Sequence, residues 1–239
     1  LNDVSGIDLI SFQEGSFGAS PTAAGVAVNL SLTASQIVHP ANLNLILQPA
    51  NAFEKLYGGS GSDVLTGSPV ANTLIGGPGN DTIIGAGGAD SLFGGTGDDT
   101  FVFNAVTSDE SDYVAEYVDE GADEITFASM SIAIFMTLNS NTAQTVHAGR
   151  TLTLNSAVTI ENLTGGAGND NLIGNNLNNT LTGNPGNDQL FGGAGSDTLA
   201  GGQGFDAYGF TNATSLENDV IVEADNQLGD SISFGSMSI

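Results

Sequence analysis

The sequence predicts an all-β fold in which short repeats stack along one axis, a β-solenoid. Residues 58–102 divide into five consecutive nine-residue units, and residues 165–209 divide into five more. Each unit has Gly at the first place, Asp or Asn at the sixth and a large apolar residue at the eighth, and most have Gly at the fourth. The first residues of the two blocks, Gly58 and Gly165, are 107 positions apart. So regular a period favours a repeat array over globular domains.

Charge and composition narrow the classes of partner. The 239 residues contain 27 acidic and only two basic side chains, Lys55 and Arg150, which gives a formal net charge of −25. So acidic a chain is not expected to bind nucleic acid or an anionic membrane surface. A hydrophobic content of 40 % argues against disorder. The chain has no cysteine, so it has no disulfide and no thiolate metal site. Divalent cations held by oxygen ligands are expected to relieve the repulsion among its acidic side chains.

A longer module contains each nonapeptide block. Residues 101–132 align without gaps with residues 208–239, and the strand pattern D-x-I-x-F occurs at 8–12, 123–127 and 230–234. We therefore expect a tandem module of about 107 residues, part of an array that continues on both sides. The predicted segments are a strand-rich spacer at 1–57, the first block at 58–102, a spacer with an acidic loop at 103–164, the second block at 165–209 and the start of a spacer at 210–239.

The spacers are predicted to add strands to the stack. Residues 25–32 and 149–154 alternate apolar with polar side chains, and residues 131–138 are a third strand candidate. No stretch has a sustained helical period, so few or no helices are expected. The longest apolar run, residues 132–138, is far shorter than the ~18 residues of a membrane span.

Each nonapeptide is expected to form one turn and one strand. Glycines at places one, two and four permit positive φ and close backbone approach. The three residues from the sixth place onward are extended, with the eighth pointing inward. Two units make one coil, so odd units stack on odd and even on even. The predicted inner ladder is Leu65, Leu74, Ile83, Leu92 and Phe101, then Leu172, Leu181, Leu190, Leu199 and Tyr208.

Stacking also brings carboxylates together. The sixth-place side chains of units n and n+2 lie roughly 4.8 Å apart, one strand spacing. They repel unless a hard cation lies between them. Calcium accepts six to eight oxygen ligands, including carbonyls of glycine turns, whereas magnesium requires a tighter octahedron and transition metals favour nitrogen or sulfur.

The G-G-x-G-x-D-x-U-x pattern of these ten units resembles the RTX-type, hemolysin-like calcium-binding repeats. The resemblance implies a right-handed parallel β-roll, carbonyls of the turn glycines in each calcium shell, and secretion by a bacterial type I exporter. It also implies that the side-chain ligands are the sixth-place aspartates, which are Asp63, Asp81, Asp90, Asp99, Asp170, Asp188, Asp197 and Asp206. The second unit of each block has asparagine instead, so Asn72 and Asn179 are expected to be weaker members, and about 4 to 6 calcium ions are expected.

The acidic run 109–124 has two interpretations, a solvated charged loop, which the sequence favours, or an extra calcium site. We find no G-x-S-x-G, H-E-x-x-H, EF-hand or Walker pattern and expect no enzymatic activity.

The leading functional hypothesis is a calcium-binding structural segment of a large secreted or cell-surface protein, such as an adhesin stalk, a surface-layer element or an extracellular fibre. Its expected partners are neighbouring copies of the module, with end-to-end assembly through open strand edges. The alternative is an accessory calcium-binding module of a secreted enzyme or toxin.

Overall fold

The computed structural model describes residues 9–11, 25–32, 36–39, 43–45, 53–105, 109–117, 121–157, 159–210, 217–223 and 229–234. The chain forms two compact units, unit 1 (Leu1–Gly121) and unit 2 (Ala122–Ile239), which are described separately. Every regular element in the described residues is a β-strand, and nearly all the pairings are parallel, so the predicted all-β solenoid is confirmed.

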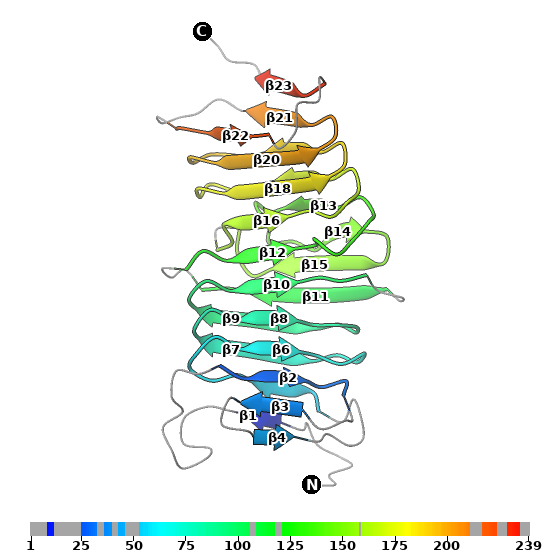
Figure 1. The fold of residues 1–239 in the computed structure, drawn as a ribbon, viewed down its shortest axis with the longest axis vertical. Helices are drawn as coiled ribbons and strands as arrows, with labels where there is room; N and C mark the ends of the chain where they lie inside the picture. The colour runs from blue at the N-terminus through cyan, green and yellow to red at the C-terminus, as the bar shows by residue number, and fades with distance from the viewer. Residues whose placement is uncertain are drawn as a thin grey trace. The chain divides into compact units, whose positions relative to one another are not determined.

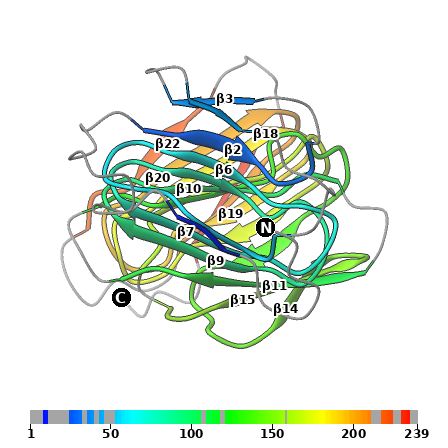
Figure 2. The ribbon, with the colours of Figure 1, turned by 90° about the horizontal axis from the view of Figure 1, so that it is seen from below.

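Unit 1 consists of two parallel sheets. Odd-unit strands lie in one sheet and even-unit strands in the other (Figures 1 and 2). The first sheet has the order β2 (Ala27–Asn29), β6 (Val64–Thr66), β8 (Thr82–Ile84) and β10 (Thr100–Val102). The second has the order β1 (Leu9–Ser11), β5 (Lys55–Tyr57), β7 (Thr73–Pro78), β9 (Ser91–Thr96) and β11 (Glu110–Ala115). An antiparallel pair, β3 (Gln36–His39) and β4 (Leu43–Leu45), comes from the spacer.

Unit 2 repeats this arrangement. Its odd-unit sheet has the order β13 (Phe135–Thr137), β17 (Asn171–Ile173), β19 (Gln189–Phe191), β21 (Ala207–Phe210) and β23 (Ser231–Phe234). Its even-unit sheet has the order β12 (Glu124–Thr126), β16 (Asn162–Thr164), β18 (Thr180–Pro185), β20 (Thr198–Gln203) and β22 (Val220–Val222). The spacer again supplies an antiparallel pair, β14 (Gln144–His147) and β15 (Arg150–Leu154).

The strand registers confirm the predicted coil of two nonapeptides. In block 1, Ile83 lies opposite Leu65 on one side and opposite Phe101 on the other, so residues 18 positions apart face one another. In block 2, Leu190 pairs with Leu172 and with Tyr208 in the same way. Every eighth-place side chain is at most 1 % exposed, so the predicted inner ladder forms the core. Each such side chain contributes roughly 1.5–3 kcal/mol through its burial.

The turn glycines have two separate roles. Positive φ occurs at second and fourth places, as at Gly77 (116°) and Gly79 (133°), and also at two non-glycine second places, Ala86 (71°) and Asn184 (73°). No first-place glycine of either block has positive φ. The sequence gives positive φ and close backbone approach as reasons for all three places together. The structure separates them, because the first place requires glycine only for what would touch its Cβ.

The three predicted spacer strands are present as β2, β13 and β15 within the expected ranges. The acidic run differs from the solvated loop that the sequence favoured, because β11 passes through it and pairs with β9. Residues 8 and 12 of the first D-x-I-x-F copy and residues 118–120 lie outside the described residues. Among the described residues there is no helix that is long and apolar enough to cross a membrane.

Candidate calcium sites

The sixth-place side chains form buried ladders along each block. All ten of them are at most 3 % exposed. Each lies directly before a strand, on the same side of the backbone as the inner apolar residue two positions later, because side chains alternate along a strand. The candidate ligands are therefore carried into the interior by the same pattern that builds the core.

One oxygen of each ladder carboxylate holds the backbone of the neighbouring coil. The Asp63 N–H donates to Oδ1 of Asp81 over 2.7 Å, and the Asp81 N–H donates to Oδ1 of Asp99 over 2.7 Å. In block 2 the Asp170 N–H donates to Oδ1 of Asp188 over 2.7 Å. Oδ1 therefore has a structural role whether or not a cation is bound, and Oδ2 is the atom on which a metal site depends.

Oδ2 lies beside the first-place glycine, at the point where a side chain on that glycine would place its Cβ. We call the space at this point a cradle. A Cβ at Gly76 would collide with Oδ2 of Asp81 and lie 2.7 Å from the carbonyl oxygen of Gly94. The carboxylate of one coil and a glycine carbonyl of the next therefore converge on one point. In the described residues, four odd-side cradles combine a carboxylate with a carbonyl in this way, at Gly58, Gly76, Gly165 and Gly183.

The carboxylates in the middle of each odd ladder have an unsatisfied oxygen. Oδ2 of Asp81 and Oδ2 of Asp188 are buried and accept no hydrogen bond. The first aspartates of the ladders differ, because Oδ2 of Asp63 accepts the Gly59 N–H over 2.6 Å. A buried carboxylate oxygen without a donor is unfavourable, and a coordinated cation would satisfy it.

Burial and like charge together disfavour ionisation at these two positions. Burial raises the pKa of Asp81 from 3.8 to about 7; the hydrogen bond from the Asp63 backbone lowers it, and the Asp63 charge raises it. Burial likewise raises the pKa of Asp188 to about 7, with further increases from the charges of Asp170 and Asp206. The ladder therefore needs positive charge to remain ionised at neutral pH.

The even ladders begin with asparagine, and both the oxygen and the nitrogen of its amide are hydrogen-bonded. Oδ1 of Asn72 accepts the Ser68 N–H over 2.6 Å, while its Nδ2 donates to the Phe53 carbonyl over 3.1 Å. Asn179 repeats this arrangement, accepting from Asn175 over 2.8 Å and donating to the Glu161 carbonyl over 3.0 Å.

The amide oxygens also border cradles of their own. A Cβ at Gly67 would lie 2.7 Å from Oδ1 of Asn72 and collide with the Gly85 carbonyl oxygen, and Gly174 is in the equivalent position. These two cradles hold neutral oxygens, which bind calcium more weakly than carboxylates do.

Several carboxylates of the spacers extend the ladders. The sequence alone did not identify them as members of the ladders. The Asp90 N–H donates to Oδ1 of Asp112 over 3.0 Å, and the Asp197 N–H donates to Oδ1 of Asp219 over 3.0 Å. The Asp206 N–H donates to Oδ1 of Asp230 over 3.0 Å. A signal was present, because each of these aspartates begins a D-x-U triplet like those of the nonapeptides, without the preceding glycine turn.

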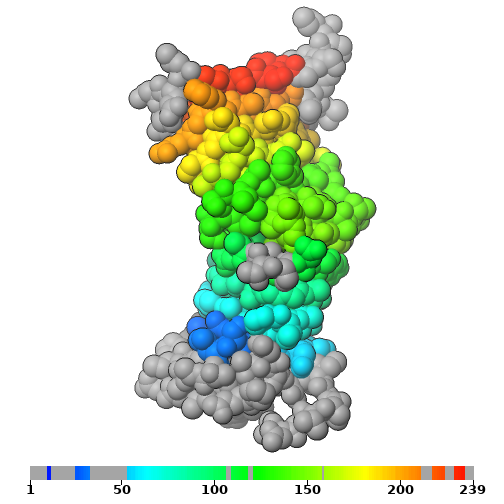
Figure 3. Space-filling model, turned by 90° about the vertical axis from the view of Figure 1, so that its right-hand side faces the viewer, coloured from blue at the N-terminus to red at the C-terminus, as the bar shows by residue number. Residues whose placement is uncertain are grey.

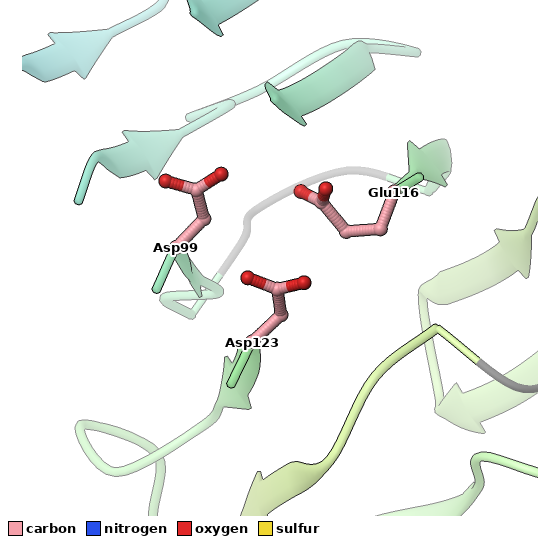
Figure 4. A group of neighbouring side chains, drawn as sticks. All are labelled: Asp99, Glu116 and Asp123. Carbon is pink, nitrogen blue, oxygen red and sulfur yellow. The ribbon is translucent and has the colours of Figure 1, made fainter. Parts of the chain in front are cut away.

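Two glutamates of the same spacers approach the ends of the odd ladders. Glu116 is 2 % exposed and offers an oxygen within 4.8 Å of one from Asp99, and Figure 4 shows the two carboxylates facing one another. In unit 2, Glu223 lies within the same distance of Asp206 and Asp230 and accepts a hydrogen bond from the Tyr208 hydroxyl.

This donor set fits calcium. It consists of carboxylate, carbonyl and amide oxygens from residues that are neighbours in space but come from different coils. Such a shell suits a hard cation that tolerates irregular geometry and high coordination number. Bound there, calcium would supply the positive charge that the stacked carboxylates require.

Comparison with known families agrees with this chemistry. The family model of the RTX calcium-binding nonapeptide repeat matches four copies, at residues 53–69, 66–101, 159–176 and 173–207. No curated protein matched the chain. The matched residues cover nearly all of both blocks and the strand before each, and RTX repeats bind calcium. The two blocks of this chain are RTX calcium-binding nonapeptide repeats.

Proposed function

We propose that the chain is a structural segment whose two blocks fold around calcium, as part of a secreted or cell-surface bacterial protein such as an adhesin stalk, a surface-layer element or an extracellular fibre. The observation that carries this proposal is the pair of buried, unpaired oxygens, Oδ2 of Asp81 and Oδ2 of Asp188, each facing a glycine carbonyl. A stack with this arrangement is unfavourable without a cation and stable with one.

The cradles suggest how many ions bind. Four cradles pair a carboxylate with a carbonyl and two pair an amide with a carbonyl, so about four ions bind well and up to about six bind in all. The ligands are the eight sixth-place aspartates, with Asn72 and Asn179 as weaker members. Turn carbonyls complete each shell.

Calcium-coupled folding explains the relation to secretion. At the low calcium level of the cytoplasm the stacked carboxylates repel and the chain stays open, a state suited to export by a type I system. At the millimolar calcium level that weak extracellular modules require, the coils close. The partners are neighbouring copies of the same module, which stack end to end.

Circular dichroism tests the proposal directly. Strand signal should appear when calcium is added to the chelator-treated chain and disappear when chelator returns. Isothermal titration should give about four strong sites per chain. A spectrum that is the same in calcium and in chelator would falsify the proposed function.

A further inference from the structure

A cavity of about 550 Å³ opens on the outer face of the odd-unit sheet of unit 2. Its wall crosses β17, β19 and β21, and β19 pairs with β17 on one side and with β21 on the other. Block 2 forms the yellow to orange layers of unit 2 in Figure 3, between the green spacer and the red strand β23. The cavity therefore lies along the stack and not at an end of it. Its volume is in the range of small-ligand sites, ~300–1,000 Å³.

Amide side chains line this cavity. Asn171 and Gln189 hold the seventh places of their units, and the parallel register sets them opposite one another. Seventh-place side chains point away from the inner ladder, because side chains alternate along a strand. Asn139, which follows β13, is exposed and borders the same cavity. Oδ1 of Asn171 is buried and accepts no hydrogen bond from the protein, so a donor brought by a ligand would satisfy it.

An aromatic ring forms another part of the wall. Phe191 holds the ninth place of its unit and lies opposite Ile173 on one side and Gly209 on the other. A Cβ at Gly209 would collide with the ring of Phe191, so the ring lies directly over the Gly209 backbone. The absence of a side chain at Gly209 therefore lets the half-buried ring lie against the sheet and border the cavity.

The two blocks differ at these outer positions although they agree at the calcium ladders. The choice between Asp and Asn is the same at all five sixth places of each block. The residues of block 1 that match Asn171, Gln189, Phe191 and Gly209 are Val64, Thr82, Ile84 and Val102. Because block 1 builds its coils and ladders without the amides, the ring and the glycine, calcium binding does not explain their presence in block 2.

The lining selects a class of ligand. None of the described residues that line the cavity is charged, and the chain has a formal net charge of −25, so an anionic ligand is disfavoured. A hydroxyl group donates and accepts hydrogen bonds, as an amide does, and the C–H face of a sugar ring packs on an aromatic ring. An extended peptide cannot add as a strand here, because β19 already has a strand on each side.

We propose that this cavity binds a neutral saccharide, with a sugar ring against Phe191 and its hydroxyl groups hydrogen-bonded to the amides of Asn171 and Gln189. Asn139 bonds a hydroxyl group at the rim. The site goes beyond the structural role proposed above, because it gives the segment a ligand of its own. It rests on the proposed function in one respect, since calcium must first fold the coils that carry its walls.

Titration of the full chain with neutral saccharides in saturating calcium tests the site. The probes are trisaccharides of glucose, galactose, mannose and N-acetylglucosamine, followed by calorimetry and by saturation-transfer NMR. At least one should bind, and Gln189→Thr and Phe191→Ile should each weaken it about tenfold, because each removes an amide or the aromatic wall. Both changes install the residue that block 1 has at that place, so the coils should still form.

The matched control is Gln203→Thr. Gln203 is an exposed glutamine on β20 and does not line the cavity, so this variant should bind like the wild type. Equal weakening by Gln189→Thr and Gln203→Thr contradicts the site. Failure of all four trisaccharides to bind overturns the proposal, and so does an equal affinity for a sulfated trisaccharide. An uncharged peptide that binds in place of every saccharide, and is lost in Gln189→Thr, would assign the cavity to a different ligand.

Circular dichroism of the same samples separates the two proposals. A wild-type chain that gains strand signal with calcium but binds no trisaccharide overturns the saccharide site and leaves calcium-coupled folding intact. Binding that Gln189→Thr abolishes, in a chain whose spectrum is the same in calcium and in chelator, supports the site and overturns the proposed function.

Discussion

The odd and even ladders share one hydrogen-bond pattern but differ in charge. In both, a sixth-place N–H donates to Oδ1 on the next coil, as Asp63 does to Asp81 and Asn72 does to Asp90. The even ladder begins with an amide whose Nδ2 donates to the Phe53 carbonyl, and a carboxylate cannot make that bond. The asparagine therefore ties the block to the segment before β5, and only the odd ladder has a carboxylate at every sixth place of its block.

The turns that open odd units also differ from those that open even units. The turns that open odd units pair directly with one another, since Gly77 lies opposite Gly95 and the Gly61 N–H donates to the Pro78 carbonyl over 2.7 Å. The even-unit strands consequently run on into those turns, and β7 has six residues where β8 has three. The carboxylate-bearing cradles are thus supported by an extended sheet.

The largest expected effect is the loss of a middle odd-side carboxylate. Asp81→Ala or Asp188→Ala should raise the calcium concentration at the folding midpoint roughly tenfold to a hundredfold, because each removes a charged ligand. Asn72→Ala should change this midpoint less. Asp81→Asn removes the charge but keeps the Oδ1 acceptor, so it separates the contribution of the charge from that of the hydrogen bond. Calcium titrations followed by circular dichroism measure all four. Equal shifts for Asp81→Ala and Asn72→Ala would contradict the distinction between the ladders.

Replacing the amide of Asn72 with a carboxylate tests the role of the amide in the even ladder. Asn72→Asp leaves the Phe53 carbonyl without its donor and places a second charge beside Asp90, so the fold at limiting calcium should lose about 1–3 kcal/mol. Saturating calcium should recover part of this loss. Urea unfolding at limiting and at saturating calcium measures both effects. Asn176→Asp adds the same charge at an exposed position and serves as control; if both variants lose the same stability, the amide of Asn72 has no special role.

Acid should stabilise the calcium-free fold. The pKa values of Asp81 and Asp188 rise from 3.8 to about 7 on folding, so the folded state binds more protons than the unfolded state between these values. In chelator the folded fraction should therefore be greatest below about pH 4 and fall as the pH rises to about 7, where the calcium-free chain is open. Calcium affinity should increase over the same window, because calcium displaces those protons.

Circular dichroism in chelator across this pH range and calcium titrations in buffers of different ionisation enthalpy measure this dependence. The double variant with Asp81→Asn and Asp188→Asn should have a flatter pH profile. A calcium-free fold that gains stability as the pH rises from 4 to 7 would show that the ladder carboxylates are ionised without metal.

The smallest expected effect concerns an even-unit turn. Ala86 has φ of 71°, a conformation that costs an L-residue about 1 kcal/mol and glycine almost nothing. Ala86→Gly should therefore stabilise the calcium-bound chain by up to about 1 kcal/mol. Asn184→Gly should bring no gain, since Asn184 has the same φ but donates to the Gly165 carbonyl over 3.0 Å. Thermal unfolding compares the two, and a stabilised Asn184→Gly would refute the distinction.

The acidic run marks the limit of sequence reasoning. Asp112 follows its ladder partner Asp90 by 22 residues rather than 18, and Asp230 follows Asp206 by 24. The extra residues interrupt the nine-residue period, so the run resembled a charged loop although Glu110, Asp112 and Glu116 are buried. The D-x-U triplet persists there, and it indicates ladder membership better than the glycine spacing does.

The sequence by itself determined the coil, the inner ladder and the sixth-place carboxylates, because an unbroken period places the same residue type at the same point of every coil. Only the tertiary structure decided what each oxygen does. Whether Oδ1 holds a backbone N–H, whether Oδ2 of Asp81 faces a glycine carbonyl, and whether Asn72 donates to Phe53 all depend on atoms of a different coil. Those atoms become neighbours only when parallel strands settle into register.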